Sequence, residues 1–263
     1  PPLPLMVDGE VVEQQPDQAS LTGRYVARAL DVLRADDDRP FFLYLAHLYV
    51  HLPIYVTEER RAASRNGAYG AAVESIDWAT GVLLAELAAR GLDRDTVVIF
   101  TSDNGSLGEG PAPWGSTDPL GGSNAPLRGT KGTTWEGGLR VPGIVRWTGT
   151  VPAGRVDHRL VTAMDLLPTL AGLCGGTLPA DRVIDGRDVS ALWLDDQVPS
   201  PHEAFFYYRG DDLEAVRDPR FKLHLAGPGE PVGALYDLHA DPAESEDVAA
   251  VHPDVVARLE ASA

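Results

Sequence analysis

The sequence is poor in cysteine and in positive charge, and it has no long hydrophobic run. The single cysteine, Cys174, excludes an internal disulfide and a cysteine-rich zinc site. Lys and Arg number 22 against 39 Asp and Glu, a net charge of −17, which argues against binding nucleic acid through the overall field. The apolar run FFLYLAHLYV is about half the length of a membrane-spanning helix. Any bound anion must therefore be held by local donors or by a metal.

The composition is that of a globular protein that buries a sizeable core. Of the 263 residues, 44% are hydrophobic and 23% are charged, which fits one large α/β unit with a small appendage. The sequence begins with Pro1 and not with Met. We therefore expect it to be part of a longer protein, whose leader cannot be judged from this chain.

Helical and strand patterns alternate along the first two thirds of the chain. Apolar periodicity predicts helices over 20–33, 67–90 and 162–173. Buried strands are predicted over 41–47, 96–104 and 141–147. Strand, helix, strand in this order indicates a mostly parallel sheet with helical crossovers.

The character of the sequence changes near residue 198. Short strand-like runs separated by turn residues, followed by a helix that begins near Pro253, predict a small antiparallel sheet with a terminal helix. We therefore expect two domains, 1–198 and 199–263. Within the second, Phe221 and Leu223 alternate with Lys222 and His224, which predicts a strand with one solvent-facing side.

The tripeptide Asp103-Asn104-Gly105 follows the predicted strand at 96–104. Turn chemistry alone explains such a tripeptide, because all three residue types tolerate left-handed backbone. However, ligands of parallel α/β sheets bind beyond the carboxyl ends of the strands. A carboxylate beside an amide offers hard oxygen ligands for Ca²⁺ or Mg²⁺. Two ligands do not complete a site, so at least two more must come from elsewhere.

A glycine-rich stretch at 105–140 holds Lys131 between Gly129 and Gly132. Glycines let backbone approach a ligand, and a lysine offers a point charge to an oxyanion. The ordinary alternative is a solvent-exposed lysine.

His51 and His47 follow the predicted strand at 41–47. For His51 a role in catalysis and a satisfied histidine at a strand end both remain open, whereas we expect His47 to be structural. Five scattered histidines are expected at the surface: His158, His202, His224, His239 and His252. No G-x-S-x-G nucleophile motif occurs, and Cys174 is expected to be a helix-end or packing cysteine rather than a catalytic one.

Several stretches in order resemble sulfatases of the arylsulfatase type. The specific ones are TVVIFTSDNG and KGTTWEGGLRVP, supported by RPFFLYLAHLYVHLP, VTAMDLLPTLAGL, IDGRDVSALW and ALYDLHADPAE. GGSN and FFYYRGD are similar to the branch that includes N-acetylgalactosamine-6-sulfatase, which favours an aryl or sugar sulfate as substrate.

The resemblance implies an alkaline-phosphatase-like α/β fold and hydrolysis of sulfate esters with a divalent cation, usually calcium, with magnesium also possible. By motif, Asp103 and Asn104 resemble the metal ligands, and Lys131 resembles the lysine that contacts the sulfate. His51, two residues before Pro53, resembles the histidine near the leaving ester oxygen. The resemblance also favours an exported or lysosomal protein.

One departure from the family bears on activity. Sulfatases use a formylglycine made within a C/S-x-P-x-R motif, and no such motif occurs in this sequence. The family's N-terminal pair of metal-binding aspartates is also missing. We therefore expect a C-terminal portion that is inactive alone, whose partner is the missing N-terminal half of the catalytic domain. Without that half, the apolar stretches at 41–45 and 97–100 are expected to be exposed.

Two alternatives remain open. Phosphodiesterases and phosphonate hydrolases share the core fold, but they usually need more Asp and His ligands for two metal ions. The chain can also be a truncated, non-catalytic relative.

Overall fold

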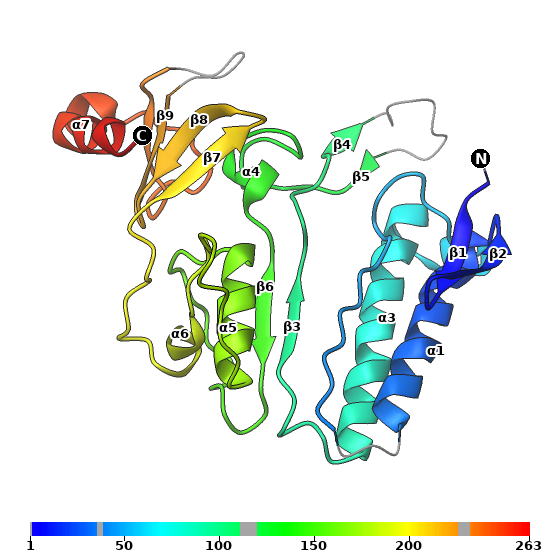
Figure 1. Ribbon diagram of the computed structural model, residues 1–263. Helices are drawn as coiled ribbons and strands as arrows, with labels where there is room; N and C mark the ends of the chain where they lie inside the picture. The colour runs from blue at the N-terminus through cyan, green and yellow to red at the C-terminus, as the bar shows by residue number, and fades with distance from the viewer. Residues whose placement is uncertain (1, 36–38, 111–119, 226–231) are drawn as a thin grey trace. The chain divides into compact units, whose positions relative to one another are not determined.

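The computed structural model describes residues 2–35, 39–110, 120–225 and 232–263, which fall into two compact units (Figure 1). The first comprises residues 1–96 with 109–122, and the second comprises 97–108 with 123–263. Within the described ranges, no helix is both long enough and apolar enough to cross a membrane.

The first unit is built on two packed helices, α1 (Leu21–Arg34) and α3 (Gly67–Ala89), which lie side by side in Figure 1. The face of α3 that is fully buried is made of small residues, including Ala71, Ala72 and Ala79. Small side chains let the helices approach closely. The unit also contains β1 (Pro4–Val7), β2 (Glu10–Gln14), η1 (Gln18–Ser20), α2 (Glu58–Ala63), β4 (Glu109–Gly110) and β5 (Leu120–Gly121).

The second unit begins with a two-stranded antiparallel ladder. β3 (Val98–Thr101) pairs with β6 (Gly143–Arg146), with Val98 opposite Arg146. The helices that follow are η3 (Ala163–Asp165), α5 (Leu166–Leu173) and α6 (Ser190–Leu194), and α4 (Glu136–Leu139) precedes β6.

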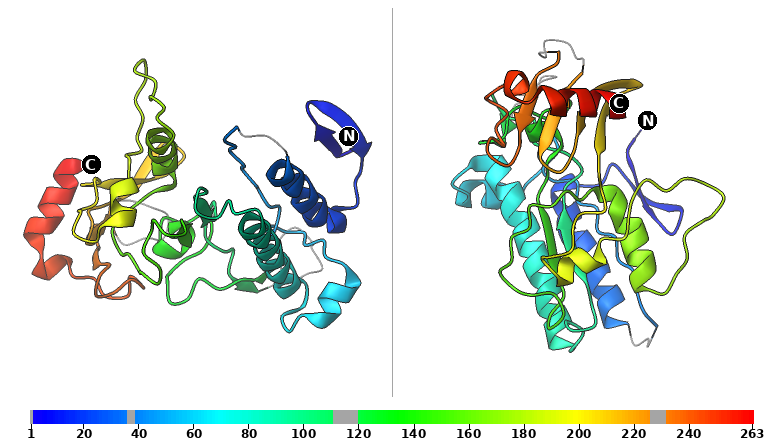
Figure 2. Two further views of the ribbon diagram at one scale, coloured as in Figure 1. Left: turned by 90° about the horizontal axis from the view of Figure 1, so that it is seen from below. Right: turned by 90° about the vertical axis from the view of Figure 1, so that its left-hand side faces the viewer.

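A four-stranded antiparallel sheet in the order β10-β9-β8-β7 completes the second unit. Its strands are β7 (Phe205–Arg209), β8 (Asp212–Arg217), β9 (Phe221–His224) and β10 (Leu235–Asp237), followed by η4 (Ala249–Val251) and α7 (Pro253–Ser262). Figure 2 shows α7 beside this sheet. Val255 and Leu259 of α7 pack against Phe221, Leu223 and Leu235 in one apolar core.

The predicted helices at 20–33, 67–90 and 162–173 are confirmed, as is the C-terminal sheet with its helix. The strands predicted over 96–104 and 141–147 are also confirmed, as the shorter β3 and β6. The predicted strand at 41–47 is wrong, because residues 40–48 lie in no helix or strand. All strand pairs among the described residues are antiparallel, so the predicted parallel pairing does not form here. A strand needs a neighbour for its backbone groups, and the neighbour of β3 in this structure is β6.

The predicted domain boundary at residue 198 stays a prediction. The C-terminal sheet lies in the same compact unit as residues 123–198. Three expectations about exposure are wrong. Lys222 and His224 of β9 are 0% exposed, so the predicted solvent-facing side of this strand is covered. His202, expected at the surface, is also buried, with its Nε2 at 2.8 Å from Asp165 Oδ1.

Candidate functional site

The predicted metal ligands lie just beyond the end of β3. Asp103 is exposed and Asn104 is half-buried, and the Ser102 hydroxyl donates to the Asn104 carbonyl at 3.1 Å. Gly105 N–H donates to the Gly138 carbonyl at 3.0 Å. A Cβ on Gly105 would lie 1.8 Å from the Gly137 carbonyl oxygen, so only glycine allows this approach. The tripeptide is thus a turn that fixes the strand end against the residues before β6.

Asn124 and Lys131 join the stretch after the tripeptide to the glycine-rich segment. The Asn124 side chain accepts from Ser106 N–H at 2.8 Å and donates to the Ser106 carbonyl at 2.9 Å. It also donates to the Gly129 carbonyl at 3.1 Å. Lys131 N–H donates to the Ser106 carbonyl at 2.9 Å. The Lys131 backbone is therefore held two residues from Asn104.

The backbone around Lys131 needs the two glycines that flank it. Gly129 and Gly132 adopt φ values of +80° and +87°, which favour glycine. Just after Gly132, the Thr133 hydroxyl donates back to the Thr130 carbonyl at 2.8 Å. Lys131 itself is half-buried. The segment is thus an ordered turn that carries Lys131.

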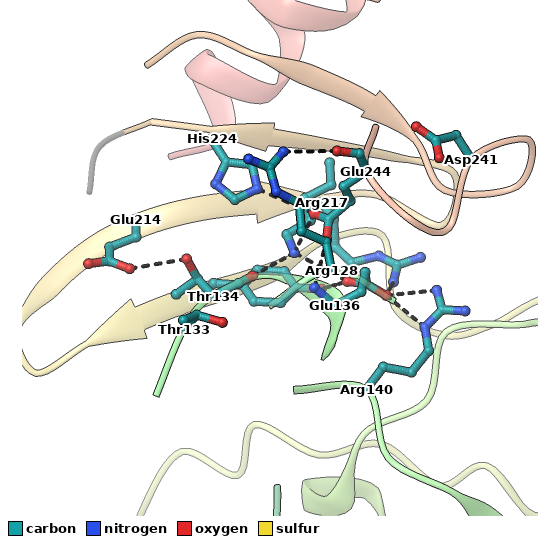
Figure 3. Close-up of polar contacts among 12 residues, drawn as sticks. Arg128, Thr133, Thr134, Glu136, Arg140, Glu214, Arg217, His224, Asp241 and Glu244 are labelled. Carbon is teal, nitrogen blue, oxygen red and sulfur yellow. Dashed lines mark hydrogen bonds and ion pairs between the residues drawn. The ribbon is translucent and has the colours of Figure 1, made fainter. Parts of the chain in front are cut away.

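A buried polar cluster lies next to this turn, between the 128–136 segment and the C-terminal sheet (Figure 3). Glu136 is 2% exposed and accepts from Arg140 Nε at 2.7 Å. Arg217 Nη1 lies 3.5 Å from Glu136 Oε2, and the Tyr207 hydroxyl donates to Glu136 Oε1 at 3.0 Å. Lys222 Nζ lies 3.3 Å from the same oxygen.

These charges decide the ionisation of Glu136. Burial by itself would raise the pKa of this carboxyl, but the positive charges of Lys222, Arg217 and Arg140 lower its pKa to about 2. Burial and the neighbouring Glu136 carboxylate raise the pKa of Tyr207 well above its ordinary value. The cluster is therefore a carboxylate held by cations, with a protonated tyrosine beside it.

The remaining predicted site residue, His51, belongs to the other compact unit. Its ring is exposed, and its Nδ1 lies 2.7 Å from the Leu52 carbonyl oxygen. The neighbouring His47 is half-buried, and burial lowers its pKa. Asp103, Asn104 and Lys131 thus belong to one compact unit, and His51 belongs to the other.

The metal prediction is consistent with the donors present but is not completed by them. Asp103 and Asn104 offer oxygen donors, the type that Ca²⁺ and Mg²⁺ prefer. Among the residues that the structure describes, no group of three or more His, Cys, Asp or Glu could hold a metal ion. A complete centre needs further ligands.

Sequence reasoning missed the buried cluster. Glu136 and Glu244 lie within KGTTWEGGLRVP and ALYDLHADPAE, two of the stretches that carry the family resemblance, yet they received no role. Their only sequence signal was their place within these two stretches.

Comparison with known proteins decides the family. A family model described as Sulfatase matches residues 9–176. This chain belongs to the sulfatase family. A second model, for the C-terminal part of N-sulphoglucosamine sulphohydrolase, matches residues 130–261 of the sulfatase chain. The predicted family is confirmed.

Relatives of the sulfatase chain include steryl-sulfatase from Rattus norvegicus, 44% identical over 212 residues, which cover 81% of this chain and 36% of the relative. N-acetylgalactosamine-6-sulfatase from Canis lupus familiaris is 42% identical, with 79% of this chain and 39% of that protein covered. The chain thus spans less than half the length of these relatives.

Solved structures confirm the fold class. The crystal structure of the PsFucS1 sulfatase from Pseudoalteromonas sp. matches with a TM-score of 0.79 and 29% identity, over 93% of this chain and 50% of that one. The Ps i-CgsB structure matches with a TM-score of 0.80 and 27% identity, over 98% of this chain and 56% of that one. The sulfatase chain therefore has the alkaline-phosphatase-like α/β fold of sulfatases, with the additional C-terminal antiparallel sheet.

Proposed function

We propose that the sulfatase chain forms part of a catalytic unit that hydrolyses sulfate esters of phenols or sugars. The observation that supports this proposal is the bond from Lys131 N–H to the Ser106 carbonyl, which ties the Lys131 backbone to the residue two positions after Asn104. A lysine near oxygen ligands for a metal ion suits a sulfate group, because the negatively charged sulfate oxygens accept hydrogen bonds from cations.

In the proposed reaction, water cleaves the S–O bond of the ester and yields the alcohol and hydrogen sulfate. The Lys131 ammonium donates to the sulfuryl oxygens and stabilises charge that develops on them. His51 donates a proton to the departing alcohol oxygen. The nucleophile is not among these residues, because no C/S-x-P-x-R motif occurs in the 263 residues. We therefore infer that a formylglycine from outside this sequence completes the site, and that the chain alone does not turn over substrate.

Asp103 and Asn104 would hold a divalent cation, Ca²⁺ in preference or Mg²⁺, together with ligands from elsewhere. When bound, such a cation supplies positive charge to the sulfuryl oxygens. One metal is favoured over two because the strand end offers an Asp–Asn pair, with Lys131 on the adjoining segment, and no denser set of carboxylates. Two ions per protein would instead favour a phosphodiesterase or phosphonate hydrolase.

The substrate class rests on the names of relatives. These include a steryl-sulfatase and an N-acetylgalactosamine-6-sulfatase, and the Ps i-CgsB structure is also described in complex with k-i-k-neocarrahexaose. An aryl or sugar sulfate is consistent with all of them.

The first test is the coding sequence upstream of Pro1. An open frame that carries a C/S-x-P-x-R motif supports the proposal. A stop codon and a start near Pro1 would make the chain a non-catalytic relative.

The second test is an assay of the protein that carries this motif. With p-nitrophenyl sulfate as substrate, Lys131→Ala is expected to lower kcat/KM by about a hundredfold or more. Arg182→Ala, which removes an exposed cation paired with Asp181 in the same unit, is the matched control and is expected to leave kcat/KM unchanged. Faster hydrolysis of bis-p-nitrophenyl phosphate than of the sulfate would replace this proposal with the phosphodiesterase alternative.

A further inference from the structure

Only two of the 22 basic residues of this chain are lysines, Lys131 and Lys222. Lys131 belongs to the candidate site, whereas Lys222 of β9 is 0% exposed. A buried ammonium is costly unless it is paired and hydrogen-bonded. The buried Lys222 ammonium must therefore have polar partners that compensate for its lost hydration.

Three acceptors surround the Lys222 ammonium. Nζ donates to the Thr134 carbonyl at 2.6 Å, and it lies 2.9 Å from Glu244 Oε1 and 3.3 Å from Glu136 Oε1. The Tyr207 ring lies 4.3 Å away. An ammonium has three donors, so these three oxygens match its capacity. Two of them belong to the segment that follows Lys131.

Glu244 holds the same segment at both of its ends. Its Oε2 accepts from Glu136 N–H at 2.7 Å. Its carbonyl oxygen accepts from Arg128 Nη1 at 3.0 Å, and the Arg128 guanidinium lies over the Trp135 ring at 3.7 Å. The labelled side chains of Arg128, Glu136 and Glu244 lie together in Figure 3. The 128–136 segment is thus attached to the C-terminal region on both sides of Lys131.

Charge balance explains why this arrangement is tolerated without solvent. The cations Lys222 and Arg217 and the carboxylates Glu136 and Glu244 are all less than 10% exposed. Removing one member leaves an opposite charge buried and unpaired, which costs more than the pair contributes. The loss of one member is therefore expected to detach the 128–136 segment from the sheet.

We propose that Lys222 and Glu244 are positioning residues, which fix the 128–136 segment and thereby place the Lys131 ammonium for the sulfate group. The proposal rests on the proposed function for the role of Lys131. It assigns the C-terminal sheet a part in catalysis through the segment that it holds.

Backbone amide hydrogen exchange of this chain tests the positioning directly. In Lys222→Met, the amides of 128–136 are expected to exchange about tenfold faster or more, whereas those of β3 keep their rates. Arg220→Met is the matched control, because it removes a cation that lies in the turn between β8 and β9 and pairs with Asp237 rather than with Glu136 or Glu244. Unchanged exchange of 128–136 in folded Lys222→Met would overturn the proposal, as would equal acceleration in Arg220→Met.

Two further variants keep the test decisive if Lys222→Met does not fold. Glu244→Gln keeps the side-chain volume and one acceptor oxygen, and it is expected to fold with faster exchange of 128–136. The double variant Lys222→Met/Glu244→Gln removes one charge of each sign. Its melting temperature is expected to recover toward that of the wild type while exchange of 128–136 stays fast. If the melting temperature and the exchange rates of 128–136 both returned to the wild-type values, the pair would be purely structural, which would contradict the proposal.

The assay of the protein that carries the nucleophile separates positioning from stability. Lys222→Met alone is expected to lower kcat/KM for p-nitrophenyl sulfate at least about tenfold, but to have little further effect in Lys131→Ala, because it acts through that residue. Additive losses would contradict positioning. If Lys131→Ala itself leaves hydrolysis unchanged, the proposed function fails, whereas the exchange result still reports on the segment.

Discussion

Residues 41–48 and strand β9 reverse the burial that their hydropathy predicts. In the apolar segment, Phe42 and Tyr44 are 77% and 82% exposed. In β9, Lys222 and His224 are 0% exposed. The two regions belong to different compact units. In β9 apolar residues alternate with Lys222 and His224 and all four residues are buried, whereas 41–48 is a nearly continuous apolar run.

The difference lies in what covers each face. In β9 the Lys222 side chain meets the Thr134 carbonyl at 2.6 Å, and the His224 ring lies 4.2 Å from that of Trp135. The glycine-rich segment thus covers a polar face and supplies polar partners. For 41–48, the described residues of its unit leave the Phe42 face open. A hydropathy pattern gives the faces of an element, but only its neighbours decide which face is buried.

The largest effect is expected from Glu244→Ala. It leaves Lys222 buried without its closest carboxylate and removes the acceptor of Glu136 N–H, so we expect a loss of about 3 to 5 kcal/mol in the free energy of unfolding. Urea denaturation measures this loss. Glu246→Ala, at an exposed position nearby, is the control and is expected to change it by less than about 0.5 kcal/mol. If Glu244→Ala and Glu246→Ala had similarly small effects, the buried charges would contribute little to stability, and the contrast between β9 and 41–48 would not hold.

The second effect is a dependence of stability on pH. The pKa of Glu136 is about 2 in the folded protein against 4.5 for the free side chain, so its contribution is complete above about pH 5.5 and is lost as the pH falls toward the folded value. We expect the wild type to lose about 2 to 3 kcal/mol from this group between about pH 5.5 and pH 2.5. Urea denaturation at a series of pH values measures it, and Glu136→Gln is expected to show a correspondingly smaller slope. Equal slopes would contradict the ion-pair account.

The smallest effect on stability is expected in the apolar segment. Phe42→Ser is expected to change the free energy of unfolding by less than about 0.5 kcal/mol and to reduce self-association, which light scattering measures. Ile54→Ser is the matched control, because Ile54 is 4% exposed and packs with Ala68 and Ala72, and it is expected to cost about 2 kcal/mol or more. A large loss in Phe42→Ser would show that this face is covered after all.

Much of the fold followed from local pattern. The helix at 67–89 and its end before Gly91, which has a φ of +71°, match the sequence prediction. The C-terminal antiparallel sheet followed from short strand-like runs between turns. The strand predicted at 41–47 does not form. A strand backbone needs a hydrogen-bonding partner, and the local sequence pattern carries no information about one.

The candidate site divided in the same way. Motif resemblance named Asp103, Asn104, Lys131 and His51, and their roles in catalysis stay predictions. The cluster around Lys222 could not be inferred, because Thr134 and Glu136 on one segment are more than 80 residues from Lys222 and Glu244 in the C-terminal region. In the sequence, the charged residues of this cluster have the pattern of a solvent-exposed face. Only the contact between the C-terminal sheet and the 128–136 segment buries them.

The sequence by itself determined the family, the main helices and the residue types at the end of β3, since these depend on motifs and on periods within a few turns. Only the tertiary structure decided that Lys222, Glu136 and Glu244 share one buried cluster, whereas the exposure of Phe42 agrees with the expectation that 41–45 is uncovered in this chain. Burial depends on which surfaces pack together. Segments that are distant in the chain therefore set the environment of each charged group, its ionisation and how firmly it is held.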